Sequence, residues 1–201
     1  MTAPDALAFR CDCGAIEGAL AGVNPGDGMR YACHCDDCQA FAEFLGRAND
    51  LLDARGGTEC FNIAASKLSF TKGRDQIACV RMTAKPTLRF FCGQCRTPIA
   101  GCLADPRLSF MTCQVAGFDP ARRDEVMGPF GGHVNTGFAY GGPGGLPPFP
   151  VWKIVLRAIG RVAMARLSGD WRRSPFFDPA SLEPVSAPTQ VSPRDRARLD
   201  A

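Results

Sequence analysis

Seven of the eleven cysteines in this 201-residue chain lie in three short clusters whose spacing suits metal binding. Cys11 and Cys13 form a C-x-C motif, residues 33–38 form C-x-C-x-x-C, and Cys92 and Cys95 form C-x-x-C. Thiolates separated by so few residues can reach one ion through a single turn, and zinc is the usual metal for such ligands. The same spacing also fits an iron–sulfur cluster, which is the alternative.

Seven thiolates divide into a set of four and a set of three. Four thiolates complete a closed, structural zinc site, whereas three leave the open position that a catalytic zinc requires. Residues 33–38 supply three ligands from one segment and are the natural set of three. We therefore expect one structural Zn²⁺ and a second, catalytic Zn²⁺. The alternatives are that both sites serve folding alone, or that the chain binds one zinc ion and three thiols remain without a metal. The predicted structural ligands are Cys11, Cys13, Cys92 and Cys95, and the predicted second-site and catalytic ligands are Cys33, Cys35 and Cys38.

The order and spacing of these motifs resemble the glutathione-dependent formaldehyde-activating enzyme family, which includes centromere protein V. Its members carry C-x-C-G, then C-x-C-x-x-C, then F-C-x-x-C. The chain matches them with Cys11-Asp12-Cys13-Gly14, with residues 33–38, and with Phe91-Cys92-Gly93-Gln94-Cys95. The resemblance covers about residues 9–118. It departs from the family pattern at residues 39–55, which form a longer insertion, and at residues 96–98, which follow the last cysteine.

The resemblance implies a fold, a ligand set and a reaction. The fold is a β-tent of antiparallel sheets around a structural zinc, and the implied ligands are the same two sets of cysteines. The reaction joins formaldehyde to the thiol of glutathione, so the chain would be a zinc-dependent carbon–sulfur lyase acting on a thiol adduct of a small aldehyde. A small thiol such as glutathione would be its partner. The alternative is a non-catalytic, zinc-stabilised binding module.

Several polar residues near the motifs are candidates for further roles. Asp36 or Asp37 could move protons, although a solvated turn or helix cap is the ordinary role for such a pair. Arg47 or Arg96 could hold a substrate carboxylate.

The two histidines and the remaining cysteines are also assigned. His34 lies between two expected ligands, so we expect its ring to point away from the metal. His133 could supply a fourth ligand to the open site. The cysteines outside the clusters lie in strand-like runs and are expected to be small buried apolar residues. These are Cys60, Cys79, Cys102 and Cys113.

The elements that must position the clusters read mainly as β-strands. Short runs rich in β-branched and aromatic residues, separated by turn signals, predict an all-β core. Residues 38–55 interrupt it with helical spacing and predict one short inserted helix. The predicted strands span residues 7–11, 15–20, 29–33, 58–63, 67–71, 76–82, 87–91, 99–103 and 109–115.

The C-terminal third has a different composition. Eight glycines and five prolines in residues 128–150 predict an irregular loop. Residues 151–167 have helical periodicity, and the basic segment 151–173 carries a net charge of +5 in a chain of net charge +3. This helix could dock a partner or an anionic surface, or cover a sheet face of its own domain. Five prolines after Ser174 predict a poorly ordered tail.

These observations divide the chain and limit its function. We expect a zinc-binding β domain at 1–127, a loop at 128–150, a basic amphipathic helix at 151–173 and a tail at 174–201. The small net charge gives no reason to expect nucleic acid as a partner. We recognise neither a secretory signal nor a membrane-spanning segment. Clustered cysteines are usually metal ligands in reducing compartments, so we expect a cytoplasmic protein.

Overall fold

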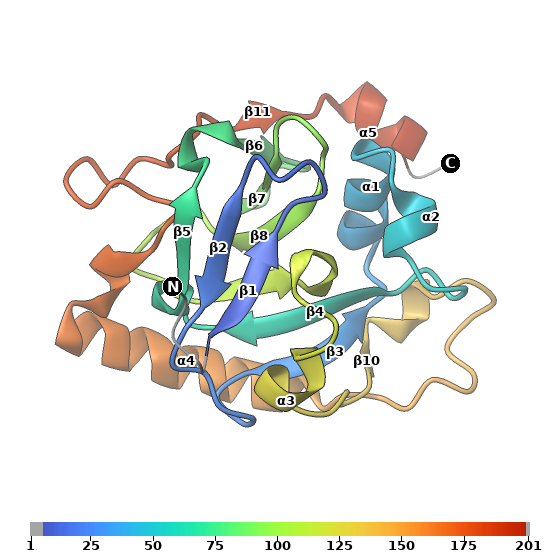
Figure 1. The fold of residues 1–201 in the computed structure, drawn as a ribbon. Helices are drawn as coiled ribbons and strands as arrows, with labels where there is room; N and C mark the ends of the chain where they lie inside the picture. Colours follow the sequence, from blue (N-terminus) through green and yellow to red (C-terminus); the bar gives the residue numbers. More distant parts are fainter. Residues whose placement is uncertain (1–5, 200–201) are drawn as a thin grey trace.

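The computed structural model describes residues 6–199 and confirms the mainly β fold. A three-stranded sheet has the order β1-β2-β5, and an eight-stranded sheet has the order β10-β3-β4-β9-β8-β7-β6-β11. Figure 1 shows the smaller sheet in front of the larger one. The strands are β1 Leu7–Arg10, β2 Glu17–Leu20, β3 Met29–Cys33, β4 Thr58–Ile63, β5 Leu68–Lys72, β6 Ile77–Arg81, β7 Thr87–Cys92, β8 Pro98–Leu103, β9 Met111–Gln114, β10 His133–Val134 and β11 Thr189–Gln190.

Most strand pairs are antiparallel, and only the two outer pairs of the larger sheet, β10 with β3 and β11 with β6, are parallel. The insertion forms two short helices, α1 and α2, where the sequence predicted one. The loop at 128–150 is largely irregular, as expected, and contributes β10 to the sheet. The helices are α1 Asp36–Phe44, α2 Ala48–Leu51, α3 Arg123–Met127, α4 Val151–Ser168 and α5 Pro193–Leu199.

The main core lies between the two sheets and is rich in phenylalanine. Phe9 from β1, Phe61 from β4 and Phe90 from β7 are fully buried in it. The rings of Phe9 and Phe118 pack edge to face at 5.2 Å. Each fully buried aromatic side chain of this kind stabilises the fold by roughly 1.5–3 kcal/mol, so the core holds the strand ends that carry the cysteines in place.

The expectation of a poorly ordered tail after Ser174 is wrong for residues 174–199. Phe176 is fully buried, and its ring stacks on Phe90 of β7 at 4.4 Å. Farther along, β11 extends the large sheet beside β6 and α5 packs on α1. Figure 1 shows this segment crossing the top of the molecule to reach α1. The free energy gained by burying an aromatic side chain outweighs the conformational entropy lost when this proline-rich segment becomes ordered.

The helix predicted at 151–167 is present as α4 and ends at Gly169, which has a φ of 75°. Its orientation is unusual. Arg157 and Arg161 point toward the domain and donate to backbone carbonyls, whereas Trp152 and Ile159 lie on the outer side and are 61% and 62% exposed. The helix packs on its own domain through Ile154, Ala165 and Arg161 and leaves its larger apolar side chains exposed.

Within residues 6–199, no helix combines the length and the apolar character that crossing a membrane requires.

Candidate metal centres

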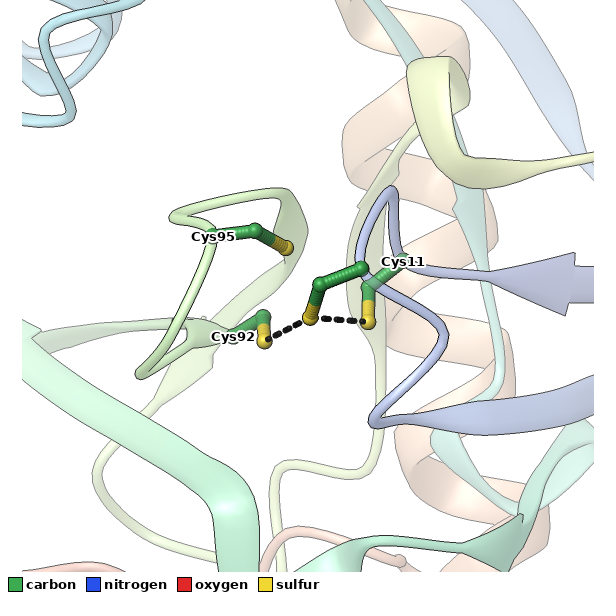
Figure 2. A group of neighbouring side chains, drawn as sticks. Cys11, Cys92 and Cys95 are labelled. Carbon is green, nitrogen blue, oxygen red and sulfur yellow. Dashed lines mark hydrogen bonds between the residues drawn. The ribbon is translucent and has the colours of Figure 1, made fainter.

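The four predicted structural ligands meet at one point, where two turns face each other. Cys11 and Cys13 lie in the turn after β1, which Gly14 closes with a φ of 69° and a hydrogen bond from its amide to the Cys11 carbonyl. Cys92 ends β7, and the turn beyond it holds Cys95. Figure 2 shows the side chains of Cys11, Cys92 and Cys95 converging from these two segments. All four sulfur atoms lie within 4.8 Å of one another.

The four-cysteine cluster has the dimensions of a tetrahedral zinc site. The Sγ atoms of Cys11 and Cys13 are 3.5 Å apart, and those of Cys13 and Cys92 are 3.8 Å apart. Four ligands at the usual zinc–sulfur distance of about 2.3 Å form a tetrahedron with edges of about 3.8 Å. All eleven cysteines are free thiols, so no disulfide consumes a ligand. The donor set therefore fits Zn²⁺.

A buried threonine, Thr97, organises the polar groups around this cluster. Its hydroxyl oxygen accepts hydrogen bonds from the Asp12 amide at 3.1 Å and from the Arg47 guanidinium at 3.1 Å. With both lone pairs engaged, the hydroxyl proton points to the Sγ of Cys95 at 3.2 Å. Burial raises the pKa of Cys95, but hydrogen bonds from the Thr97 hydroxyl and amide and from the Cys13 amide and thiol together outweigh it and lower that pKa to about 6. The environment thus favours a thiolate at Cys95.

The three predicted second-site ligands also meet, at the junction of β3 and α1. Cys33 ends β3, Cys35 precedes the first residue of α1, and Cys38 lies in its first turn. The Sγ atoms of Cys33 and Cys35 are 3.4 Å apart, and all three sulfurs lie within 4.8 Å of one another. The amide of Asn135 donates to the Cys33 sulfur at 3.3 Å. Three thiols at one turn suit a metal that keeps one position open.

A buried arginine, which the sequence did not single out, faces this three-cysteine cluster. Arg89 of β7 is 8% exposed, and its Nη2 donates to the Cys38 sulfur at 3.6 Å. Hydrogen bonds from the neighbouring thiols of Cys33 and Cys35, reinforced by Arg89, hold the pKa of the Cys38 thiol well below its usual range. No carboxylate of residues 6–199 forms an ion pair with Arg89. Burial lowers the pKa of the Arg89 guanidinium, but the Cys38 sulfur, with smaller contributions from Cys35 and Asp37, raises that pKa overall.

A cavity of about 200 Å³ opens beside the same cluster. Its wall includes Tyr31, Cys33, Cys38, Arg89, Thr112 and Gln114. The wall thus combines two of the three clustered thiols with one buried cation and four uncharged polar side chains, the fourth being Thr87. This arrangement can bind a small molecule that carries both a sulfur atom and a negative charge.

The two arginines predicted to hold a carboxylate lie elsewhere. Arg47 forms an ion pair with Asp12 at 2.6 Å, beside the four-cysteine cluster. Arg96 donates to the backbone carbonyl of Phe44 at 2.8 Å. Neither lines the cavity, where Arg89 is the cation.

The carboxylates of Asp36 and Asp37 form ion pairs in the first turn of α1. Asp37 lies 2.9 Å from the Nζ of Lys85 and 3.3 Å from the Nη2 of Arg196. Asp36 lies 3.7 Å from the same arginine. Negative charge in this position also favours the helix dipole, so the pair has a structural role.

His34 and His133 contact each other and do not join the three thiols. The Nε2 of His34 lies 2.9 Å from the Nδ1 of His133, and the Nδ1 of His34 lies 3.0 Å from the Arg55 carbonyl oxygen. Asp53 lies beside them, with its carboxylate and the two rings within 4.8 Å. The ring of His34 therefore points away from the three thiols, as expected. His133 lies with His34 and Asp53 and is not a fourth ligand of the three-cysteine cluster.

The four cysteines outside the clusters are buried, as expected. Cys79 and Cys113 lie in the core, whereas Cys60 and Cys102 also line the cavity beside Arg89. They supply apolar wall rather than a further ligand set.

A mainly β domain with two converging cysteine clusters has the features of a zinc-binding domain. The chain belongs to the family described as "Family of unknown function (DUF6151)", whose model matches residues 4–181. The structural neighbours include the crystal structure of a Rhodobacter sphaeroides protein from a structural genomics programme. The match has 20% identity and a TM-score of 0.39, and covers 60% of this chain and 97% of that one. A similarity this distant identifies neither fold nor function. A search of curated proteins finds no match.

Proposed function

We propose that the protein is a zinc enzyme that forms and cleaves the carbon–sulfur bond between a small thiol and a small aldehyde. Cys11, Cys13, Cys92 and Cys95 would hold a structural ion, and Cys33, Cys35 and Cys38 a catalytic one. The observation that carries the proposal is the cavity beside the three-cysteine cluster, because Arg89 and two of the thiols face it together. The resemblance in motif spacing to the glutathione-dependent formaldehyde-activating family points to the same chemistry.

The residues of the cavity have distinct parts in this proposal. Cys33, Cys35 and Cys38 would hold the zinc ion, which would supply the Lewis acidity that favours the thiolate form of a substrate thiol. Arg89 would bind a carboxylate of the substrate, because this guanidinium lines the cavity and has no carboxylate ion-pair partner among the described residues. The hydroxyls of Tyr31 and Thr112 and the amide of Gln114 line the space where the aldehyde oxygen would lie.

The reaction is balanced without another reactant. The thiol sulfur bonds to the aldehyde carbon, the π bond of the carbonyl breaks, and the thiol proton ends on the new hydroxyl oxygen. The reverse reaction returns both components. A cavity of about 200 Å³ is smaller than the roughly 300–1,000 Å³ of typical ligand sites, so it would take only the reacting end of a tripeptide thiol.

The test combines metal content with a direct assay. Elemental analysis of reduced protein is expected to give two zinc ions per chain, and exchange NMR with glutathione and formaldehyde is expected to give faster formation of S-hydroxymethylglutathione. Cys35→Ser should lose one zinc and the acceleration. Cys79→Ala is the matched control, because Cys79 is buried outside both clusters and the cavity, and it should retain both. Two zinc ions without acceleration would exclude this reaction.

A second candidate is a zinc-stabilised binding module without catalysis. The observation that favours it is the exposed apolar side of α4, which the catalytic proposal does not use. Two zinc ions per chain with no acceleration of the thiol–aldehyde reaction would favour the binding module, whereas acceleration would favour the enzyme.

A further inference from the structure

The outer side of α4 is an apolar surface that no other described part of the chain covers. Along the helix, large apolar side chains recur at spacings of three and four residues and stay at least half exposed, up to 84% at Leu167. Figure 1 shows α4 along the lower edge of the molecule, with one side turned away from the sheets. The apolar surface of α4 consists of Trp152, Val155, Leu156, Ile159 and Leu167.

Hydrogen bonds to the domain hold the helix in this orientation. Arg157 donates from Nη1 to the carbonyls of Gly26 and Gly28, at 2.6 and 3.0 Å. Arg161 donates to the Asn62 side chain at 2.8 Å and also to the Asp27 carbonyl. Turning the helix over would break these charge-assisted bonds, so the apolar surface faces outward as part of the fold. Most surface helices of globular proteins bury the opposite, apolar side.

Positive charge surrounds the apolar surface of α4. Lys153 and Arg166 are exposed on the helix itself, and Arg172 and Arg173 follow it. Asp170 is the only acidic residue of the basic segment 151–173, and it lies 3.2 Å from Arg173, which it neutralises. An apolar stripe flanked by Lys and Arg, with tryptophan near its end, is typical of helices that lie in the plane of a membrane interface.

We propose that α4 docks the protein onto an anionic lipid surface, with Trp152, Leu156 and Ile159 inserted among the lipids. Anionic headgroups complement the positive charge of Lys153, Arg166 and Arg172, which remain exposed. A second copy of the chain fits less well, because a symmetric pair through this surface would bring two such groups of charges together. The inference goes beyond carbon–sulfur chemistry and does not depend on it.

The test uses the full chain and sedimentation with lipid vesicles. One set contains phosphatidylcholine alone, and the other contains equal parts of phosphatidylcholine and phosphatidylglycerol. Leu156→Gln combined with Ile159→Gln removes the apolar contact, and Leu156→Met combined with Ile159→Leu is the matched apolar control. Trp171→Phe leaves Trp152 as the only tryptophan, because the chain has two, and reports insertion by its fluorescence.

We expect binding to the anionic vesicles, a blue shift of Trp152 and weaker binding at high salt. The double glutamine variant should bind at least about tenfold more weakly, and the apolar control should bind like the unaltered protein. Absence of binding to anionic vesicles, or equal binding by the glutamine variant, would overturn the proposal. A dimer that the glutamine variant abolishes would assign the surface to a second copy instead. Zinc content and thiol chemistry should be unchanged in every case.

Discussion

The two cysteine clusters differ in how the chain assembles them. The four-cysteine cluster joins two turns that are 79 residues apart between Cys13 and Cys92. The three-cysteine cluster comes from one turn and faces a cavity with a buried cation. A cluster that joins distant segments contributes to folding, whereas a local cluster beside a cavity is available for chemistry. The strand β7 connects them, because it carries both Arg89 and Cys92.

The largest expected difference between the clusters is in stability. Cys92→Ser should lower the free energy of unfolding by about 3 kcal/mol or more, because the structural metal and the link between the turns are lost together. Cys35→Ser should have a much smaller effect. Thermal unfolding followed by circular dichroism, with zinc content measured on the same samples, makes the comparison. Equal melting temperatures for the two variants would contradict it.

The next effect concerns the cavity alone. Arg89→Gln should lower kcat/KM for glutathione and formaldehyde about 10–100-fold, because a hydrogen-bonded ion pair with the substrate carboxylate contributes roughly 1.5–3 kcal/mol. A thiol substrate that lacks carboxylates should show a smaller loss. Arg89→Lys keeps the charge and should recover part of the rate. Equal losses for both thiols would mean that Arg89 only orders the cavity.

A third difference concerns zinc affinity at the four-cysteine cluster. Thr97→Val removes the hydrogen bond to the Cys95 sulfur and should weaken zinc binding about 10–100-fold, the usual cost of losing a partner that supports a ligand. Competition with a colorimetric chelator measures this affinity. Thr71→Val is the control, because Thr71 is an exposed threonine of β5 whose hydroxyl donates to the Glu17 carbonyl and contacts no clustered cysteine. Weaker binding at the three-cysteine cluster in Thr97→Val would show that the sites are not independent.

The smallest expected effect is that of the ion pair at the first turn. Asp12→Asn removes one of the two carboxylate partners of Arg47 and leaves Asp50, and partly exposed pairs of this kind contribute about 1 kcal/mol or less. We expect a decrease of a few degrees in melting temperature, further reduced at high salt, and full zinc content. Loss of zinc would show that the pair is needed to form the turn.

Much of the fold follows from the sequence. The strands at residues 29–33 and 58–63 begin and end where their β-branched and aromatic residues predict, and both cysteine sets meet as their spacing predicts. Short motifs and alternating patterns are local properties, so one sequence suffices to find them. Zinc itself, and the boundaries of the four predicted regions, remain predictions.

The features that the sequence did not predict depend on contacts between distant segments. A lone arginine in an apolar strand does not reveal which side it faces, so Arg89 was missed. Periodicity identifies the two sides of α4 but not which one packs, and here hydrogen bonds to carbonyls of residues 26–28 decide. The proline content of the tail hid Phe176, although two adjacent phenylalanines in a polar segment are a signal of burial.

The position of Phe176 in the core has a consequence for synthesis of the chain. A ribosome releases the N-terminal part first, so all seven clustered cysteines, the last at residue 95, emerge about 80 residues before Phe176. The metal ligands can therefore assemble on a nascent domain whose core still lacks the ring that stacks on Phe90. Until that ring arrives, the surface of β7 it covers stays open to solvent. Translation of the last quarter of the chain is thus the step that completes the core.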